Sequence, residues 1–396
     1  MKLLQNEALD FSPATADYPT LTDEQINRKY VKGDVRIVTE QARYPLESVP
    51  AMLNGTRYKL NPEYQRRRRW DNAKKSLLIE SFIINVPVPP IFLYEVQFSQ
   101  YEVMDGLQRL TTIADFYANR FALEGLTEWP ELIGRTYSAL PEQIQRGIDR
   151  RYISSIILLQ ETAKLPADAQ YLKQLVFERI NSGGVSLEPQ ESRNAIYNGA
   201  LNRLCLELSR TKALCELWGI PAPVGDEAIG PLPAELIENK YFREMYDVEL
   251  VLRFFAYRQR SKRPHGAFRN FLDDYQKLGN SFPPSVLDGL RQLFLNTISL
   301  AQDLLGEEAF WLWRNRDGNW DWLARSTTAV YDPLMFVLSQ FTGKQAEKLL
   351  RQRDSIRENI KAFYEQSYET FEGRNTNPSI LDERDAAFTQ FFEQYI

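Results

Sequence analysis

Histidine is nearly absent from this chain of 396 residues, since His265 is its only one. Serine and cysteine triads, histidine-ligated zinc sites and histidine-dependent nuclease centres all need an imidazole, and often two. His265 lies in the turn-like stretch RPHG, where an exposed residue without a catalytic role is the more common case. Unless His265 serves, the sequence excludes these chemistries.

The chain also has only two cysteines and no long apolar run. Cys205 and Cys215 lie in an apolar, helical context without metal-ligand spacing, which predicts buried free thiols in a reducing compartment. No stretch approaches the length needed to span a bilayer, and the N-terminus lacks the apolar segment of a signal peptide. These absences predict a cytoplasmic protein with no membrane partner.

Two common nucleotide-binding motifs are missing as well. Neither GxxxxGKS/T nor GxGxxG occurs, so a P-loop or Rossmann site is not supported. The net charge of −5 means that nucleic-acid contacts would need a local basic patch. Four arginines at residues 66–69 lie beside Tyr64 and Trp70, and guanidinium and aromatic groups together suit phosphates and bases. A solvated charge run ahead of a helix explains them equally well.

Residues 101–118, YEVMDGLQRLTTIADFYA, predict a strand, a glycine turn and a helix with one apolar face. The first amides of a helix lack partners within the helix and favour negative charge. Gly106 would let a phosphate approach the backbone, Arg109 could fork onto two of its oxygens, and Asp105 could hold a divalent cation or orient a water. On this pattern alone the structural alternative is favoured, in which Asp105 caps the helix and Arg109 pairs with a carboxylate.

The segments around this turn predict a mixed domain. A helix at residues 74–84 precedes the strand IFLYEV, and a helix near 141–150 precedes a strand at 153–159. The turn NSGG at residues 181–184 then breaks a helix, and another helix begins near Pro189. Its first turns carry Glu191, Arg193 and Asn194, which form either a second wall of the same site or a cap with an internal salt bridge.

The second half of the chain is predicted to be helical. We expect an N-terminal arm at residues 1–29, a mixed domain at 30–210, a Pro/Gly-rich linker at 211–234 and a helical domain at 235–396. The expected helices cover residues 234–259, 266–278, 284–305, 327–341, 344–371 and 380–395. Arg258, Arg260, Lys262 and Arg263 form a second basic cluster, which indicates nucleic-acid contacts or, more often, a helix end that favours cations.

Three segments occur in an order and spacing that resemble one family. They are YQR at residues 64–66 with Trp70, DGLQRLTTI at 105–113, and ERINSGG followed by QESRNAIYNG at 178–199. Over roughly residues 30–205 the chain resembles the N-terminal domain of GmrSD-type restriction endonucleases, a family marked by a DGQQR motif on a ParB/sulfiredoxin-like fold. The resemblance implies an α+β fold class: a ParB/sulfiredoxin-like mixed N-terminal domain followed by an all-α C-terminal domain, as in standalone members without the C-terminal HNH-type nuclease domain.

The resemblance also implies a function. It is that of a nucleotide-binding and NTP-hydrolysing component of anti-phage defence or modification-dependent DNA restriction, with a nucleoside triphosphate and Mg²⁺ as cofactors. The motif positions make Asp105, Gln108 and Arg109 catalytic and Asp105 the metal ligand. The cofactor-binding residues implied in the same way are Gly106, Arg66, Asn181 and Arg193.

One residue departs from the family's motif, because Leu107 stands where the motif has its first Gln. Leu107 instead fits the apolar face of the helix. This departure favours the alternative of a non-catalytic DNA- or partner-binding module of the same fold, and a metal-dependent DNA nuclease acting at DGLQR is a third option. The implied partners are DNA and a nuclease or other defence-system protein, and a homo-oligomer stays open.

Overall fold

The structure, a computed structural model, describes residues 3–12, 21–32, 37–59, 70–159, 172, 175–177, 179, 188–225, 227, 232–262, 268–372 and 377–396. The chain divides into two compact units. The sheet unit comprises Asp17–Leu187, and the helical unit comprises Met1–Ala16 and Glu188–Ile396. The division therefore falls at Leu187, before the predicted linker at residues 211–234.

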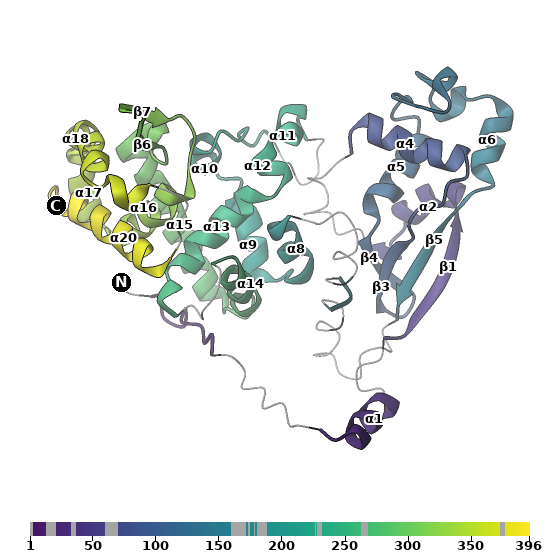
Figure 1. The fold of residues 1–396 in the computed structure, drawn as a ribbon, viewed down its shortest axis with the longest axis horizontal. Helices are drawn as coiled ribbons and strands as arrows, with labels where there is room; N and C mark the ends of the chain where they lie inside the picture. Colours follow the sequence, from purple (N-terminus) through teal and green to yellow (C-terminus); the bar gives the residue numbers. More distant parts are fainter. Residues whose placement is uncertain are drawn as a thin grey trace. The chain divides into compact units, whose positions relative to one another are not determined.

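Within the described part of the chain, the sheet unit is built on five strands in the order β1-β5-β3-β4-β2 (Figure 1). β3 is central, since it pairs antiparallel with β4 and parallel with β5. β1 pairs antiparallel with β5, and the short β2 pairs parallel with β4. The strands are β1 (Thr39–Pro45), β2 (Tyr58–Lys59), β3 (Ile91–Gln97), β4 (Gln100–Asp105) and β5 (Tyr152–Leu158).

Helices of the sheet unit pack on one another and bury one face of these strands. α2 and α4 both contact α5, and Leu110, Ile113 and Phe116 of α5 lie in one buried cluster with Leu93 and Val103 of the strands. This confirms the apolar helix face predicted from the sequence. The helices are α1 (Asp23–Lys32), η1 (Leu46–Ser48), α2 (Val49–Asn54), α4 (Asn72–Ile83), α5 (Leu107–Tyr117), η2 (Pro130–Leu132), η3 (Tyr137–Ala139) and α6 (Glu142–Asp149).

Two carboxylates fix α4 in this unit. Asp71 caps its first turn, accepting a hydrogen bond from the Lys74 backbone N–H at 2.7 Å. Glu80 is buried and accepts hydrogen bonds from the backbone N–H groups of Thr127 (3.3 Å), Glu128 (2.8 Å) and Trp129 (3.0 Å). Burial alone would raise the pKa of Glu80, but these bonds outweigh it and lower the pKa.

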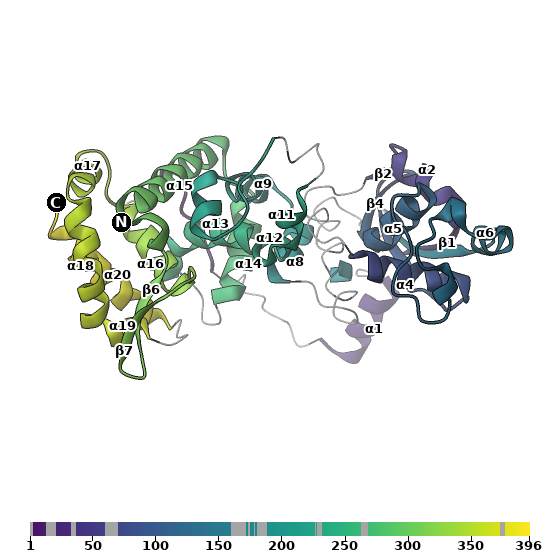
Figure 2. The same cartoon turned by 90° about the horizontal axis from the view of Figure 1, so that it is seen from above.

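The helical unit is arranged around its longest described helix, α15 (Pro284–Leu305), which contacts α9, α13, α16, α17 and α18 (Figure 2). Cys205 and Cys215 are buried free thiols, as predicted. Among the described residues, no helix combines the length and the apolar character needed to cross a bilayer. The remaining helices are α8 (Pro189–Ile196), α9 (Ala200–Leu208), α10 (Lys212–Leu217), α11 (Ala234–Glu238), α12 (Lys240–Arg243), α13 (Tyr246–Tyr257), η5 (Arg260–Lys262), α14 (Phe268–Gly279), η6 (Gly306–Glu308), α16 (Thr328–Leu338), α17 (Lys344–Arg351), α18 (Arg353–Gln366), α19 (Tyr368–Phe371) and α20 (Pro378–Glu393).

The described part of the helical unit also contains a β-hairpin. β6 (Leu312–Arg316) and β7 (Asn319–Leu323) pair antiparallel, and Asp317 and Gly318 turn between them with φ of 51° and 89°. Asp-Gly with positive φ at both positions is typical of a tight hairpin turn. The α+β fold class is confirmed. The described residues of the C-terminal part form helices and this hairpin, which the prediction of an all-α domain did not include.

Two long predicted helices are broken into shorter ones. Within residues 234–259, Asn239 ends α11 and caps α12, accepting a hydrogen bond from the Phe242 N–H at 3.1 Å. Met245 then adopts a left-handed conformation with φ 57°, so α13 begins in a new direction. Residues 344–371 likewise form α17, α18 and α19. Polar side chains that bond the backbone locally compete with helix continuation, which apolar periodicity does not reveal.

The N-terminal segment at residues 3–12 belongs to the core of the helical unit, which corrects the expectation of an arm there. The buried Glu7 carboxylate accepts two hydrogen bonds from Arg258, each at 2.9 Å. Gln259 donates to the Glu7 carbonyl at 2.8 Å, and the Phe11 ring lies 4.8 Å from that of Phe271. A buried carboxylate with two guanidinium contacts holds the segment in place.

Two arginines of the second basic cluster form ion pairs inside this unit. Arg258 pairs with Glu7, and Arg260 forms ion pairs with Asp382, at 2.7 Å, and with Asp385. Arg263 lies outside the described residues. Arg258 and Arg260 therefore stabilise the fold, which is the commoner of the two readings that the sequence allowed.

Candidate functional site

The predicted strand-glycine-helix turn is present in the sheet unit. β4 ends at Asp105, Gly106 adopts the left-handed conformation with φ 95°, and α5 begins at Leu107. A Cβ at Gly106 would lie 2.5 Å from Ile91 Cγ2 and 3.0 Å from Arg109 Nη2. Glycine is required here for its conformation and for space.

Among the described residues no side chain caps the N-terminus of α5, and the first turn of this helix carries no acidic residue. The first helical hydrogen bond runs from the Leu110 N–H to the Gly106 carbonyl at 3.0 Å, so the three amides before Leu110 precede the helical ladder. Asp105 is not the cap that the structural alternative expected, because Gly106 occupies that position. This helix end therefore favours an anion.

Arg109 fixes one oxygen of Asp105. Its Nη2 donates to Asp105 Oδ2 at 2.8 Å and to the Pro90 carbonyl at 3.1 Å. The Arg109 side chain is 15% exposed, whereas that of Asp105 is 41% exposed. Asp105 Oδ1 makes no hydrogen bond with any residue that the structure describes, so Arg109 holds one carboxylate oxygen and leaves the other without a partner there, on a side chain that is 41% exposed.

Gln108 links the turn to the segment of the first family-like motif. Its Oε1 accepts a hydrogen bond from the Trp70 backbone N–H at 3.3 Å, and Lys74 Nζ lies 5.2 Å from the centroid of the Trp70 ring. Trp70 directly follows the arginine run in the sequence. Arg66 itself, with residues 60–69, lies outside the described residues.

Leu107 confirms the interpretation of the one departure from the motif. Its side chain is 8% exposed and belongs to the buried cluster of the sheet unit. The first residue of α5 therefore packs in the core, while Gln108 and Arg109 stay half-buried.

Arg193 has a role different from the predicted one. It lies in α8 of the helical unit, 1% exposed, and its guanidinium donates to Asp273 (2.6 Å), Glu249 (2.8 Å), Gln190 (3.0 Å) and the Arg269 carbonyl (3.2 Å). With Nε, Nη1 and Nη2 all engaged inside this unit, Arg193 is a buried structural residue, which corrects its assignment to a nucleotide pocket. Asn181 lies outside the described residues.

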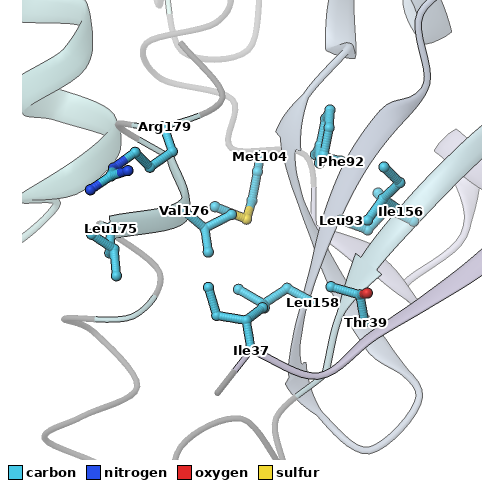
Figure 3. Close-up of a pocket in the computed structure, with 10 residues that line it drawn as sticks. All are labelled: Ile37, Thr39, Phe92, Leu93, Met104, Ile156, Leu158, Leu175, Val176 and Arg179. Atoms are coloured by element: carbon cyan, nitrogen blue, oxygen red, sulfur yellow. The ribbon is translucent and has the colours of Figure 1, made fainter. Parts of the chain in front are cut away.

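The sheet unit also contains a cavity of about 490 Å³ (Figure 3). Its strand residues include Phe92, Met104 and Ile156, which alternate along β3, β4 and β5 with residues of the buried cluster. Arg179, from the ERINSGG segment, also lines it. Sequence reasoning missed this cavity, although alternate apolar residues on the second face of each strand were a signal for it.

A divalent cation fits this turn through a single carboxylate. In the described part of the chain, no group of three or more Asp, Glu, His or Cys side chains is arranged to hold a metal. Mg²⁺ commonly binds one or two carboxylates and takes its other ligands from water and substrate phosphates. The open Oδ1 of Asp105 matches that arrangement.

Comparison with known proteins identifies the family of this part of the chain. Residues 49–198 match the family model described as GmrSD restriction endonuclease, N-terminal domain. No curated protein and no solved structure matches the chain. The match includes the DGLQR turn, and it indicates a role in a restriction system, which implies interaction with DNA. The resemblance predicted from the motifs is confirmed, since residues 49–198 match the N-terminal domain of GmrSD restriction endonucleases.

Proposed function

We propose that this chain binds a nucleoside triphosphate with Mg²⁺ at the DGLQR segment and hydrolyses it, as the nucleotide-dependent component of a DNA restriction system. The observation that carries the proposal is that the Asp105 carboxylate and the N-terminus of α5 lie on either side of Gly106. The partly exposed Asp105 carboxylate suits a cation, and the N-terminus of α5, which no side chain caps among the described residues, suits a phosphate. Gly106 separates them and makes the turn in the left-handed conformation, with φ 95°.

Different residues of the turn bind the phosphates and the cation. The first amides of α5 donate to phosphate oxygens, and Arg109 supplies positive charge beside them. Arg109 also orients the Asp105 carboxylate through the 2.8 Å contact to Oδ2, which leaves Oδ1 as the cation ligand. Arg66 remains a proposed second source of positive charge.

Hydrolysis needs a positioned water and stabilisation of charge on the terminal phosphate. Gln108, held by the Trp70 N–H, orients a water toward the terminal phosphorus. The water oxygen forms the new P–O bond, the bond to the bridging oxygen breaks, the diphosphate leaves with its electron pair, and the water proton passes to solvent. Arg109 neutralises charge as it develops. Mg²⁺, when bound, withdraws charge from the phosphate oxygens.

One observation favours a second function, a phosphate-binding module without turnover. Asp105 and Arg109 already form an ion pair at 2.8 Å, and the Leu107 side chain packs in the core. Such a module would recognise a nucleotide or a DNA phosphate at the same turn, and it would leave cleavage to a partner.

The test compares substitutions of two acids, Asp105 at the end of β4 and Asp115 in α5. Asp105→Asn removes the proposed metal ligand. The control, Asp115→Asn, removes an acid of α5 that forms ion pairs with Lys75 of α4 (3.2 Å) and with Arg120 (3.0 Å). Asp105→Asn loses one ion pair and Asp115→Asn loses two, so we expect the control variant to lose at least as much stability. We expect Asp105→Asn to lower phosphate release by at least about 100-fold, a loss typical of a group that stabilises the transition state, and Asp115→Asn to change it by less than about 2-fold.

Equal effects of the two substitutions would contradict the assignment of Asp105. Wild-type protein that binds the nucleotide with Mg²⁺ but releases no phosphate, with or without duplex DNA, would establish the second function. Nucleotide binding is measured in parallel by titration calorimetry with a non-hydrolysable triphosphate.

A further inference from the structure

The cavity of the sheet unit begins at the residue that precedes the DGLQR turn. Met104 lines the cavity, and Asp105 is the first residue of the motif. In the β3–β4 pairing, Phe92 lies opposite Asp105 and Leu93 opposite Val103, so the register shift leaves Met104 as the extra residue of a bulge. Bulges redirect side chains and are frequent beside functional sites.

The lining of the cavity is almost wholly apolar. Phe92, Met104 and Ile156 contribute from the strands, and Leu175 and Val176 face them from the segment at residues 175–177. Figure 3 shows the Met104 side chain extending from the sheet toward Val176. A pocket of about 490 Å³ with this lining suits a flat group held between side chains, because ligand pockets are mainly apolar and of this size.

A nucleotide carries a flat base on the same molecule as its phosphates. Neighbouring strand residues are about 3.3 Å apart, and a nucleoside triphosphate is several times longer, so phosphates at the N-terminus of α5 and a base beyond Met104 can belong to one molecule. Bases stack face to face on aromatic side chains, and such stacking does not need hydrogen bonds to the edges of the base. Phe92 and the thioether of Met104 provide contacts of this kind.

We propose that this cavity receives the base of the nucleotide whose phosphates bind at Asp105–Arg109, an inference that rests on the proposed function. The phosphate end is held by charge and backbone amides, and the base end by apolar contact with Phe92, Met104 and Ile156. The two ends of the ligand therefore depend on different residues, and they can be separated by experiment.

The first experiment compares a nucleoside triphosphate with inorganic tripolyphosphate, which carries the phosphates without a base. Ile156→Trp fills the cavity and Phe92→Ala removes its aromatic side chain. Ile133→Trp is the control, since Ile133 is an exposed isoleucine of the same unit that does not line the cavity. We expect both cavity variants to raise the Kd of the nucleotide by at least about 10-fold, the loss of one stacking contact, and to leave the Kd of tripolyphosphate within about 2-fold.

The second experiment follows the NMR signal of a methyl group in the cavity of the wild-type protein, so it still tests the inference if Ile156→Trp fails to fold. The chain has five methionines, of which Met52 and Met104 lie in the described part of the sheet unit. With ¹³C-methyl methionine, the nucleotide should shift the Met104 methyl signal through the ring current of its base, and tripolyphosphate should not. Met52, in the buried cluster, should move with neither ligand.

The outcomes separate this inference from the proposed function. Wild-type protein that binds nucleotide and tripolyphosphate, with unchanged nucleotide Kd in both cavity variants and an unmoved Met104 methyl, would overturn the base pocket alone. Wild-type protein that binds neither ligand would overturn the proposed function and the base pocket with it.

Discussion

Replacing Gly106 with alanine tests whether the DGLQR turn is built as the structure shows. Gly106 has φ 95°, and a Cβ there would approach Ile91 Cγ2 to 2.5 Å. A left-handed conformation costs a non-glycine residue about 1–2 kcal/mol, and overpacking a buried site adds about 1–3 kcal/mol. Gly106→Ala should therefore destabilise the sheet unit by about 2–5 kcal/mol.

Gly134 provides the matched control. It lies in the same unit with φ 82°, but a Cβ there would meet nothing within 4 Å. Gly134→Ala shares the conformational cost and the reduced freedom of the unfolded chain, so the difference between the two variants isolates the contact term of about 1–3 kcal/mol.

Hydrogen exchange is the suitable assay, because the two units can open separately and exchange reports local free energies. Peptides that cover β3 to α5 should lose more protection in Gly106→Ala than those around residue 134 lose in Gly134→Ala. Adding Ile91→Ala should reduce the cost of Gly106→Ala, since it removes the crowding methyl group. Equal costs for the two glycines, or no coupling to Ile91, would refute the packing described for this turn.

Three further predictions concern buried charges. The pKa of Glu80 is lowered in the folded protein, so the ionised carboxylate stabilises the sheet unit at pH values above the unfolded-state pKa of about 4.5. This stabilisation is lost as the pH falls through the lowered pKa. Glu80→Gln should therefore make the free energy of unfolding depend less on pH, as measured by denaturation from pH 6 to 3. Glu7→Ala should cost the helical unit about 3–5 kcal/mol by leaving Arg258 buried and unpaired, whereas Lys212→Ala, in an exposed pair, should cost no more than about 0.5 kcal/mol in the same urea titration. Arg193→Lys should fail to restore the stability lost in Arg193→Ala, because one ammonium cannot replace a guanidinium bonded through Nε, Nη1 and Nη2, and tripolyphosphate affinity should stay unchanged in both.

The features that the sequence predicted best are local ones. The turn at Asp105–Arg109 follows from the change of apolar period from two to about 3.6 residues and from one glycine between them. The burial of Leu107 depends on neighbours within a few residues. Such features need no knowledge of the rest of the fold.

The features that the sequence did not predict depend on distant partners. Arg193 is bonded to Glu249 and Asp273, and Glu7 to Arg258, and no local pattern reveals pairs so far apart in the chain. For this reason α8 was assigned to the mixed domain and residues 3–12 to an arm. The hairpin at Asp317-Gly318 is different, because its Asp-Gly turn between alternating aromatic residues was a readable signal.

The cavity shows a third kind of limit. Phe92 and Met104 were recognisable as strand residues, but the face on which each side chain lies depends on the bulge before Asp105 and on the pairing of β3 with both neighbours. Register of this kind is set by tertiary contacts. The strand pattern alone therefore indicated the position of the proposed anion site but not the cavity beside it.

The central claim is nucleotide hydrolysis at the DGLQR turn, and its most direct test is phosphate release from each of the four ribonucleoside triphosphates. The assay is run with Mg²⁺ or with a chelator, with and without duplex DNA, on wild type and Asp105→Ala. We expect release that requires Mg²⁺ and disappears in Asp105→Ala. No release by wild type under any of these conditions, or release that Asp105→Ala leaves intact, would contradict the proposed function.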